Sequence, residues 1–152
     1  MHLELQVADE GEKSCEQIWI SAKSLEYMAL SMLKRQRLFS VNSVLALSPQ
    51  TMQDVDQQIE NVFRVFELQL RHKQLSFQIQ TDCQCLGIFL AEWELYELIL
   101  FHLLSNAVKY STTGGCIIII LSPQETQDSI TLKTCVRDSG VGISEEKLNM
   151  IR

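Results

Sequence analysis

The long, almost uniformly apolar segment over residues 92–111 most strongly limits how this chain can fold. Its periodicity predicts one helix with apolar side chains on two sides, because residues three and four apart share a helix face. These side chains are Leu100, Leu104 and Ala107 on one side and Leu98, Phe101 and Val108 on the other. A helix that is hydrophobic around most of its circumference is buried. We therefore expect this helix to lie between two layers of the structure.

Strand-like segments flank this helix in the sequence. Residues 75–79 alternate apolar and polar side chains as a half-buried strand does, and a short run over residues 86–90 leads into the helix. After the glycine pair at 114–115, residues 116–121 form a continuous β-branched run that suits the middle of a sheet, and residues 130–137 form the next strand. The pattern predicts an α+β chain, folded as a two-layer α/β sandwich with helices on one face of a mixed sheet.

A second helical pattern precedes these strands. Ser48 followed by Pro49 is a cap and first-position pair, and apolar side chains then recur at helical spacing until about Arg71. They are Met52, Val55, Ile59, Val62 and Phe66. We therefore predict that one domain covers residues 48–152.

The N-terminal part, residues 1–47, begins with a polar tail and continues with a separate helical pattern. Its apolar positions are four, three, four and three residues apart, which is the seam of a helix that a partner helix could cover. We call these positions the seam: Ile18, Ala22, Leu25, Ala29 and Met32. Two heptads do not prove a coiled coil. The alternative is an amphipathic helix that packs on its own domain.

The apolar helix carries one polar face near its end. His102, Asn106, Lys109 and Tyr110 point the same way, because they are three or four residues apart. An amide oxygen is a hard, neutral ligand that suits Mg²⁺, an ammonium group suits phosphate oxygens, and a phenol ring can stack on a base. This combination indicates half of a nucleotide pocket.

A D-x-G-x-G turn after the last predicted strand supplies the other half. Asp138 opens it, and an ionised carboxylate only accepts hydrogen bonds, so it suits the exocyclic amine of adenine better than the oxygen of guanine. Gly140 and Gly142 lack side chains, which allows a positive φ and a close approach of the base to the backbone. Ser144 stands at the N-cap position of a short final helix.

Together, residues 103–111 (LLSNAVKYS) and 136–144 (VRDSGVGIS) resemble the N-box and the first glycine box of the ATP-binding domain of sensor histidine kinases. That domain belongs to the ATPase superfamily that also contains DNA gyrase, chaperones and mismatch-repair proteins. The resemblance implies ATP and Mg²⁺ as ligands. By this resemblance, Asn106 is the Mg²⁺ ligand, Lys109 contacts a phosphate, and Tyr110 contacts the adenine or the ribose.

The same resemblance implies that Asp138, Gly140 and Gly142 bind the adenine end of ATP. His102 stands where the family often has a second Asn, so it is either a further nucleotide or metal contact or a packed structural residue. Each motif alone is compatible with an ordinary turn or helix end. Their order, their separation and the strands between them favour the joint interpretation.

The implied function is that of the ATP-binding portion of a sensor histidine kinase. In such a two-component phosphorelay, a protein histidine is phosphorylated from ATP and the phosphoryl group then passes to an Asp of a response regulator. The seam helix is similar to the second helix of the dimerisation hairpin, which implies a homodimer, and a receiver domain is a further implied partner. The alternative is a non-catalytic or degenerate module for nucleotide sensing or dimerisation. A gyrase-like or chaperone-like ATPase is a third possibility.

Some family features are absent from the sequence. None of His2, His72 and His102 lies in the H-E-x-x-x-P context of the phosphoacceptor histidine. The chain stops at Arg152, before the motifs that form the ATP lid and the second glycine box. We therefore expect a fragment or truncated product of a histidine kinase, which has no catalytic residue of its own and does not autophosphorylate alone.

Composition argues against several other classes of protein. A net charge of −6 does not suit a general nucleic-acid binder. Five cysteines without C-x-x-C spacing fit free thiols in a reducing compartment better than disulfides. No apolar run approaches the ~20 residues of a membrane span, and the N-terminus lacks the basic and apolar regions of a signal peptide. We expect a cytoplasmic chain, whose parent receptor could be membrane-bound.

Overall fold

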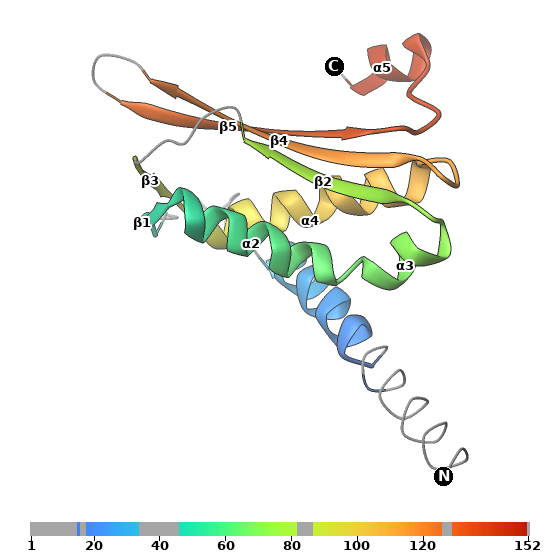
Figure 1. Cartoon of the computed structure of the whole chain (residues 1–152), viewed down its shortest axis with the longest axis horizontal. Helices are drawn as coiled ribbons and strands as arrows, with labels where there is room; N and C mark the ends of the chain where they lie inside the picture. Colours follow the sequence, from blue (N-terminus) through green and yellow to red (C-terminus); the bar gives the residue numbers. More distant parts are fainter. Residues whose placement is uncertain (1–14, 16–17, 34–45, 82–86, 126–128, 152) are drawn as a thin grey trace.

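The computed structural model describes residues 15, 18–33, 46–81, 87–125 and 129–151. Figure 1 shows a twisted sheet with helices on one of its faces. The two long helices of that face are α2 (Met52–Arg64) and α4 (Trp93–Tyr110). The predicted α+β class and the two-layer sandwich are confirmed.

The main sheet contains three strands in the order β2 (Ser76–Thr81), β4 (Cys116–Glu125) and β5 (Ile130–Asp138). β4 pairs parallel with β2 and antiparallel with β5, so the sheet is mixed. Ile117, Ile119 and Leu121 of β4 are fully buried, because alternate residues of a strand point to the same face and this face carries the helices. The β-branched run therefore forms the middle strand, as predicted.

α4 covers nearly all of the predicted apolar helix. On one side, the Tyr96 hydroxyl lies 3.1 Å from Thr134 Oγ1 of β5. On the other side, Phe101 stacks on Tyr27 of the N-terminal helix (residues 18–33), with ring centroids 4.6 Å apart. α4 therefore lies between the sheet and the N-terminal helix, which confirms that it is buried between layers (Figure 1).

The predicted helix start at Ser48 and Pro49 is wrong. Both residues belong to the short strand β1 (Ser48–Thr51), which pairs antiparallel with β3 (Ile88–Ala91) in a separate two-stranded sheet. Trp93 Nε1 donates to the Ser48 backbone oxygen at 2.6 Å, and this long-range contact fixes the segment in an extended conformation. Pro49 is tolerated because the strand has an open edge that needs no N–H.

The predicted single helix up to Arg71 is divided into α2 and α3 (Glu67–His72). Val65 and Phe66 form a turn between the two helices, and both side chains are buried. Phe66 packs against Phe101 of α4 with ring centroids 5.2 Å apart. Packing in the core, rather than a helix-breaking residue, therefore accompanies the division.

α2 begins instead at Met52, after the N-cap residue Thr51, which forms a capping box with Asp54. Asp54 N donates to Thr51 Oγ1 at 3.3 Å, and Thr51 N donates to Asp54 Oδ2 at 2.8 Å. These bonds satisfy backbone N–H groups that a helix start otherwise leaves unpaired. They also lower the pKa of Asp54, chiefly through the bond from the Thr51 backbone.

We expect Thr51→Ala to destabilise the protein by about 1 kcal/mol, within the ~0.5–2 kcal/mol observed when an N-cap hydroxyl is lost. Urea denaturation measures this change. The matched control is Thr113→Ala, in the exposed turn before β4, for which a change below about 0.5 kcal/mol is expected. Equal midpoints for the two variants would show that the capping box does not stabilise α2.

The N-terminal helix packs on α4 with the face opposite its seam. Ile20 is buried and Tyr27 is half-buried, and burial next to the carboxylates of Glu97 and Glu26 raises the pKa of Tyr27 to about 12. All five seam positions, by contrast, are exposed, with Ile18, Leu25 and Met32 between 66% and 73% exposed. The helix therefore packs on its own domain and still presents the apolar seam outward. Most of the predicted polar tail lies outside the described residues.

The last predicted element is confirmed as α5 (Glu145–Ile151), where the Ser144 backbone oxygen accepts from Leu148 N at 2.9 Å. Among the described cysteines, Cys15, Cys116 and Cys135 are free thiols. No helix in the described part of the chain is long and apolar enough to cross a membrane.

Candidate nucleotide-binding site

The end of α4 and the D-x-G-x-G turn after β5 meet directly. Ser111, the residue after α4, forms an isolated β-bridge with Gly140. A Cβ atom on Gly140 would lie 2.5 Å from Asp138 Oδ1 and 2.8 Å from the Tyr110 backbone oxygen. Two motifs about thirty residues apart in sequence are therefore in contact, and the contact requires a residue without a side chain.

The turn orients the carboxylate of Asp138. Gly140 N donates to Asp138 Oδ1 at 2.7 Å, so the side chain bonds to its own backbone two residues on. Gly142 has φ +71°, in the left-handed region that favours glycine. Gly140 does not use the positive φ that its residue type allows, and a glycine is required there by close packing against the end of α4.

The predicted polar face of α4 is exposed. His102, Asn106, Lys109 and Tyr110 are all accessible, and Lys109 Nζ lies 5.1 Å from the centroid of the Tyr110 ring, within the range of a cation–π interaction. Tyr110 adjoins the turn through its backbone, and Asn106 lies one helical turn earlier. The face and the turn thus meet where the Tyr110 backbone contacts Gly140.

His102 contacts the N-terminal helix. Its Nε2 atom lies 3.0 Å from Ser31 Oγ, and its ring packs edge-on against Phe101 with centroids 5.6 Å apart. These contacts agree with the packed structural alternative. A contact of His102 with nucleotide or metal stays a prediction.

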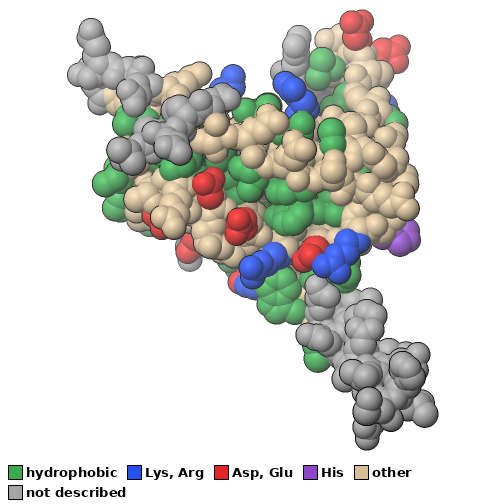
Figure 2. Space-filling model, viewed as in Figure 1, with side chains coloured by type: hydrophobic (Ala, Val, Ile, Leu, Met, Phe, Trp, Pro, Cys, Tyr) green, Lys and Arg blue, Asp and Glu red, His purple; other side chains and the backbone are tan. Residues whose placement is uncertain are grey.

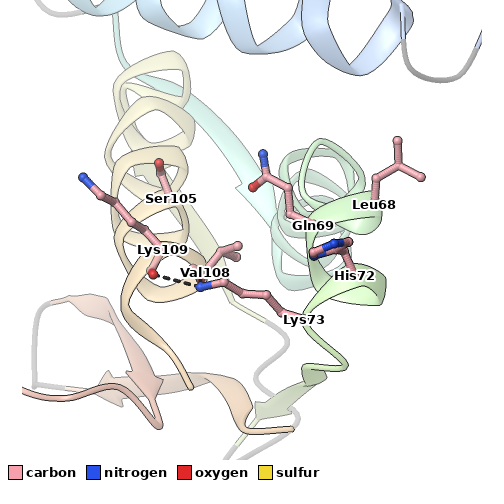
Figure 3. Close-up of a pocket in the computed structure, with 7 residues that line it drawn as sticks. All are labelled: Leu68, Gln69, His72, Lys73, Ser105, Val108 and Lys109. Carbon is pink, nitrogen blue, oxygen red and sulfur yellow. Dashed lines mark hydrogen bonds between the residues drawn. The ribbon is translucent and has the colours of Figure 1, made fainter. Parts of the chain in front are cut away.

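Lys73 is a residue of this region that the sequence did not indicate. It follows α3, and its ammonium donates to the backbone oxygens of Val108 and Lys109 at 2.8 Å each and of Ser111 at 3.3 Å. Figure 3 shows the side chain reaching from α3 to the end of α4. Its acceptors are 35 to 38 residues away in sequence, so no local pattern could have identified it.

A cavity of about 810 Å³ lies between α3 and α4, beside this lysine (Figure 3). Its lining consists of Leu68, Gln69, His72, Lys73, Ser105, Val108 and Lys109. Lys109 is the one predicted site residue among them. The cavity therefore adjoins the predicted nucleotide site from the α3 side and does not contain Asp138 or Asn106.

A smaller hollow of about 420 Å³ lies between α2 and β2. Figure 2 shows hydrophobic side chains gathered in the middle of this face, with charged side chains at their border. Phe63 and Phe77, which line the hollow, stack with centroids 3.9 Å apart. None of the predicted site residues lines it.

One buried polar atom at the junction has no partner. Ser111 is 5% exposed, and its Oγ makes no hydrogen bond among the described residues. Buried hydroxyl groups are normally paired, so an orphaned one at a predicted ligand site is notable. The Ser111 backbone, by contrast, is fully engaged: its N–H donates to the Ala107 oxygen at 3.0 Å, and its own oxygen accepts from Lys73.

Comparison with known proteins gives a family for this region. The family model described as "Histidine kinase-, DNA gyrase B-, and HSP90-like ATPase" matches residues 93–152, from α4 to α5. The hybrid signal transduction protein dokA of Dictyostelium discoideum is 42% identical over 53 residues, which are 35% of this chain. The histidine protein kinase SaeS of Staphylococcus aureus is 28% identical over 109 residues, or 72% of this chain.

The chain spans 3% of the length of dokA and 30% of that of SaeS. Among solved structures, the histidine kinase ThkA in complex with the response regulator protein TrrA covers 86% of this chain with a TM-score of 0.56, and 36% of the ThkA chain is matched. Its sequence identity is 21%, so this likeness concerns the fold. Residues 93–152 therefore resemble the histidine-kinase-like ATPase family, and one of the relatives to which the chain is similar is a histidine protein kinase.

Proposed function

We propose that this chain binds ATP with Mg²⁺ at the junction of α4 and the D-x-G-x-G turn, as the ATP-binding portion of a sensor histidine kinase. The observation that carries the proposal is the contact of Gly140 with Tyr110 and Ser111. This contact sets the carboxylate of Asp138 beside the end of the helix that presents Asn106 and Lys109.

Each proposed role follows from the chemistry of the side chain. Asp138 accepts a hydrogen bond from the adenine amine. A carboxylate has about four acceptor sites, and the hydrogen bond from Gly140 N occupies one of them. Asn106 provides a neutral oxygen to Mg²⁺, which keeps most of its waters and the nucleotide phosphates as other ligands. Lys109 contacts a phosphate and Tyr110 covers the adenine or ribose.

The residues present fit such a ligand. The orphaned hydroxyl of Ser111 is a buried group that a bound molecule or its water could pair. Gly140 and Gly142 keep the turn free of side chains near Asp138. When bound, ATP supplies the transferable phosphoryl group, and the described residues bind and orient it.

The wider proposal is a two-component phosphorelay. The γ-phosphoryl group of ATP passes to an imidazole nitrogen of a protein histidine outside this site, leaving ADP, and then to an Asp of a receiver domain. The complex of ThkA with a response regulator supports this class of partner. The exposed seam supports a homodimer in which the seams of two copies pair. The alternative, a non-catalytic nucleotide-sensing module, has the same nucleotide site and lacks the phosphoryl transfer.

Calorimetric titration tests the proposed ligand. We expect ATP to bind in the presence of Mg²⁺ with Kd of about 0.1–1 mM, which corresponds to roughly 4–5.5 kcal/mol of binding free energy. The binding is expected to be weak because, among the described residues, the proposal assigns only Asn106 and Lys109 to the Mg²⁺ and phosphate end of the nucleotide. Asn106→Ala should remove mainly the Mg²⁺-dependent part of the affinity. Equal affinity of the wild type for GTP, or an unchanged Mg²⁺ dependence in Asn106→Ala, would contradict the proposal.

A further inference from the structure

The last turn of α4 carries two of the proposed nucleotide contacts, Lys109 and Tyr110, and it is held by bonds from outside the helix. The final carbonyl groups of an α-helix have no partner within the helix, and helix ends without partners fray. At this end, the Ala107 oxygen accepts from Ser111 N. The next two carbonyl groups, of Val108 and Lys109, both accept from the ammonium of Lys73.

The same ammonium also reaches beyond the helix. It lies 3.3 Å from the oxygen of Ser111, the residue that bridges to Gly140 of the turn. An ammonium group has three N–H donors, and here three carbonyl oxygens lie within hydrogen-bonding distance of it. A cation at a helix C-terminus is also favoured by the partial negative charge of the carbonyl groups. The donors of Lys73 are therefore committed to the α4 end rather than to the adjoining cavity.

The backbone of Lys73 is fixed as well. Lys73 N donates to the Gln69 oxygen at 3.0 Å, and the Lys73 oxygen accepts from Gly114 N at 3.0 Å, in the turn after α4. Gln74 follows with φ +55°, and Ser76 N then donates to the Gly115 oxygen at 3.0 Å. One residue thus connects the end of α3 to the chain on both sides of Ser111.

We propose that Lys73 is a positioning residue for the nucleotide site, which holds the last turn of α4 so that Lys109 and Tyr110 face the ligand. The inference rests on the proposed function, because the ligand of that site is ATP. Lys73 does not touch the nucleotide. Its effect is confined to the end of α4, and Asn106 precedes the two helix carbonyl groups that it holds, those of Val108 and Lys109.

This arrangement predicts that loss of the Lys73 ammonium lowers the affinity for ATP without changing the dependence of that affinity on Mg²⁺. Without the ammonium, the last turn of α4 frays and the contacts of Lys109 and Tyr110 weaken, whereas the Mg²⁺ contact of Asn106 is preserved. Lys73→Met keeps the aliphatic stem and removes the donors. Lys73→Arg keeps a cation with N–H donors and should rescue most of the effect.

The experiment measures two quantities on the whole chain. Calorimetry with ATP, with and without Mg²⁺, gives affinity, and backbone amide exchange without nucleotide gives protection at residues 109–111. We expect Lys73→Met to weaken ATP about tenfold and to speed exchange at these amides about tenfold, with the ratio of affinities with and without Mg²⁺ unchanged. Lys133→Met, which removes an exposed lysine of β5, is the matched control and should change neither quantity.

Three outcomes decide the inference. A fall in affinity with faster exchange, restored by Lys73→Arg, supports it. Wild-type affinity in Lys73→Met, while the wild type binds ATP, overturns it and leaves the proposed function intact. Absence of ATP binding by the wild type overturns the proposed function and this role of Lys73 together, even if exchange shows that the lysine caps α4.

Discussion

Gly140→Ala is expected to separate the D-x-G-x-G turn from the end of α4 and to lower nucleotide affinity more than tenfold. The new Cβ would lie 2.8 Å from the Tyr110 oxygen, and this neighbour is backbone and cannot rotate away. It would also lie 2.5 Å from Asp138 Oδ1, which the bond from Gly140 N holds in place. Inserting a methyl group into such a contact costs about 1–3 kcal/mol of stability.

Gly142→Ala is the matched control for the stability effect of Gly140→Ala, because Gly142 is itself a predicted contact of the nucleotide. A Cβ at Gly142 would have no heavy atom within 4 Å, so Gly142→Ala is destabilised only by the strained backbone φ of +71°. This conformation costs an alanine about 1–2 kcal/mol, and Gly142→Asn should recover part of it because Asn tolerates the left-handed region. Urea denaturation and ATP titration measure both effects. If Gly140→Ala matched the wild type in stability and in ATP affinity, the close contact between turn and helix would not exist in solution.

The layers of the fold could be predicted because their signals are local. The apolar circumference of α4 and the β-branched run of β4 each report burial on both sides, and burial of this kind leaves few architectures. The helix start could not be predicted in the same way. Ser48 and Pro49 read locally as a cap, but pairing with β3 and the bond from Trp93 place them in a strand. Contacts forty residues away thus override a weak local preference.

In the candidate site too, features set by local structure could be predicted from the sequence, and features set by contacts distant in sequence could not. Asn106, Lys109 and Asp138 could be proposed as site residues from residue type and spacing, because a helix face and a turn are local structures. The contact between the two motifs gives Gly140 a packing role that a general argument about glycine flexibility did not provide. Lys73 could not be found at all, since a lysine at the end of one helix carries no sign that its acceptors belong to another. His102 points toward the N-terminal helix, which a helix-face argument alone does not consider.

Asp138→Asn is expected to weaken ATP at least tenfold and to reduce the preference for ATP over GTP. The carboxylate offers acceptors only, whereas an amide also offers two N–H donors, which suit the guanine oxygen. A hydrogen bond to a charged group contributes roughly 1.5–3 kcal/mol, which corresponds to about tenfold or more in affinity. Titration of the wild type and of Asp138→Asn with ATP and GTP in Mg²⁺ gives the two affinities of each protein and their ratio.

The substitution leaves the shape of the turn unchanged, which makes the result specific. Asn forms the same turn as Asp, with its side-chain oxygen accepting from the backbone N–H two residues on, so the bond from Gly140 N is retained. Asp138→Ala removes that bond as well and serves as the comparison for lost structure. Because a distorted turn lowers both affinities together, only direct recognition of the base changes the ratio of ATP to GTP. An unchanged ratio in Asp138→Asn would therefore assign Asp138 to the turn alone and leave adenine recognition to other residues.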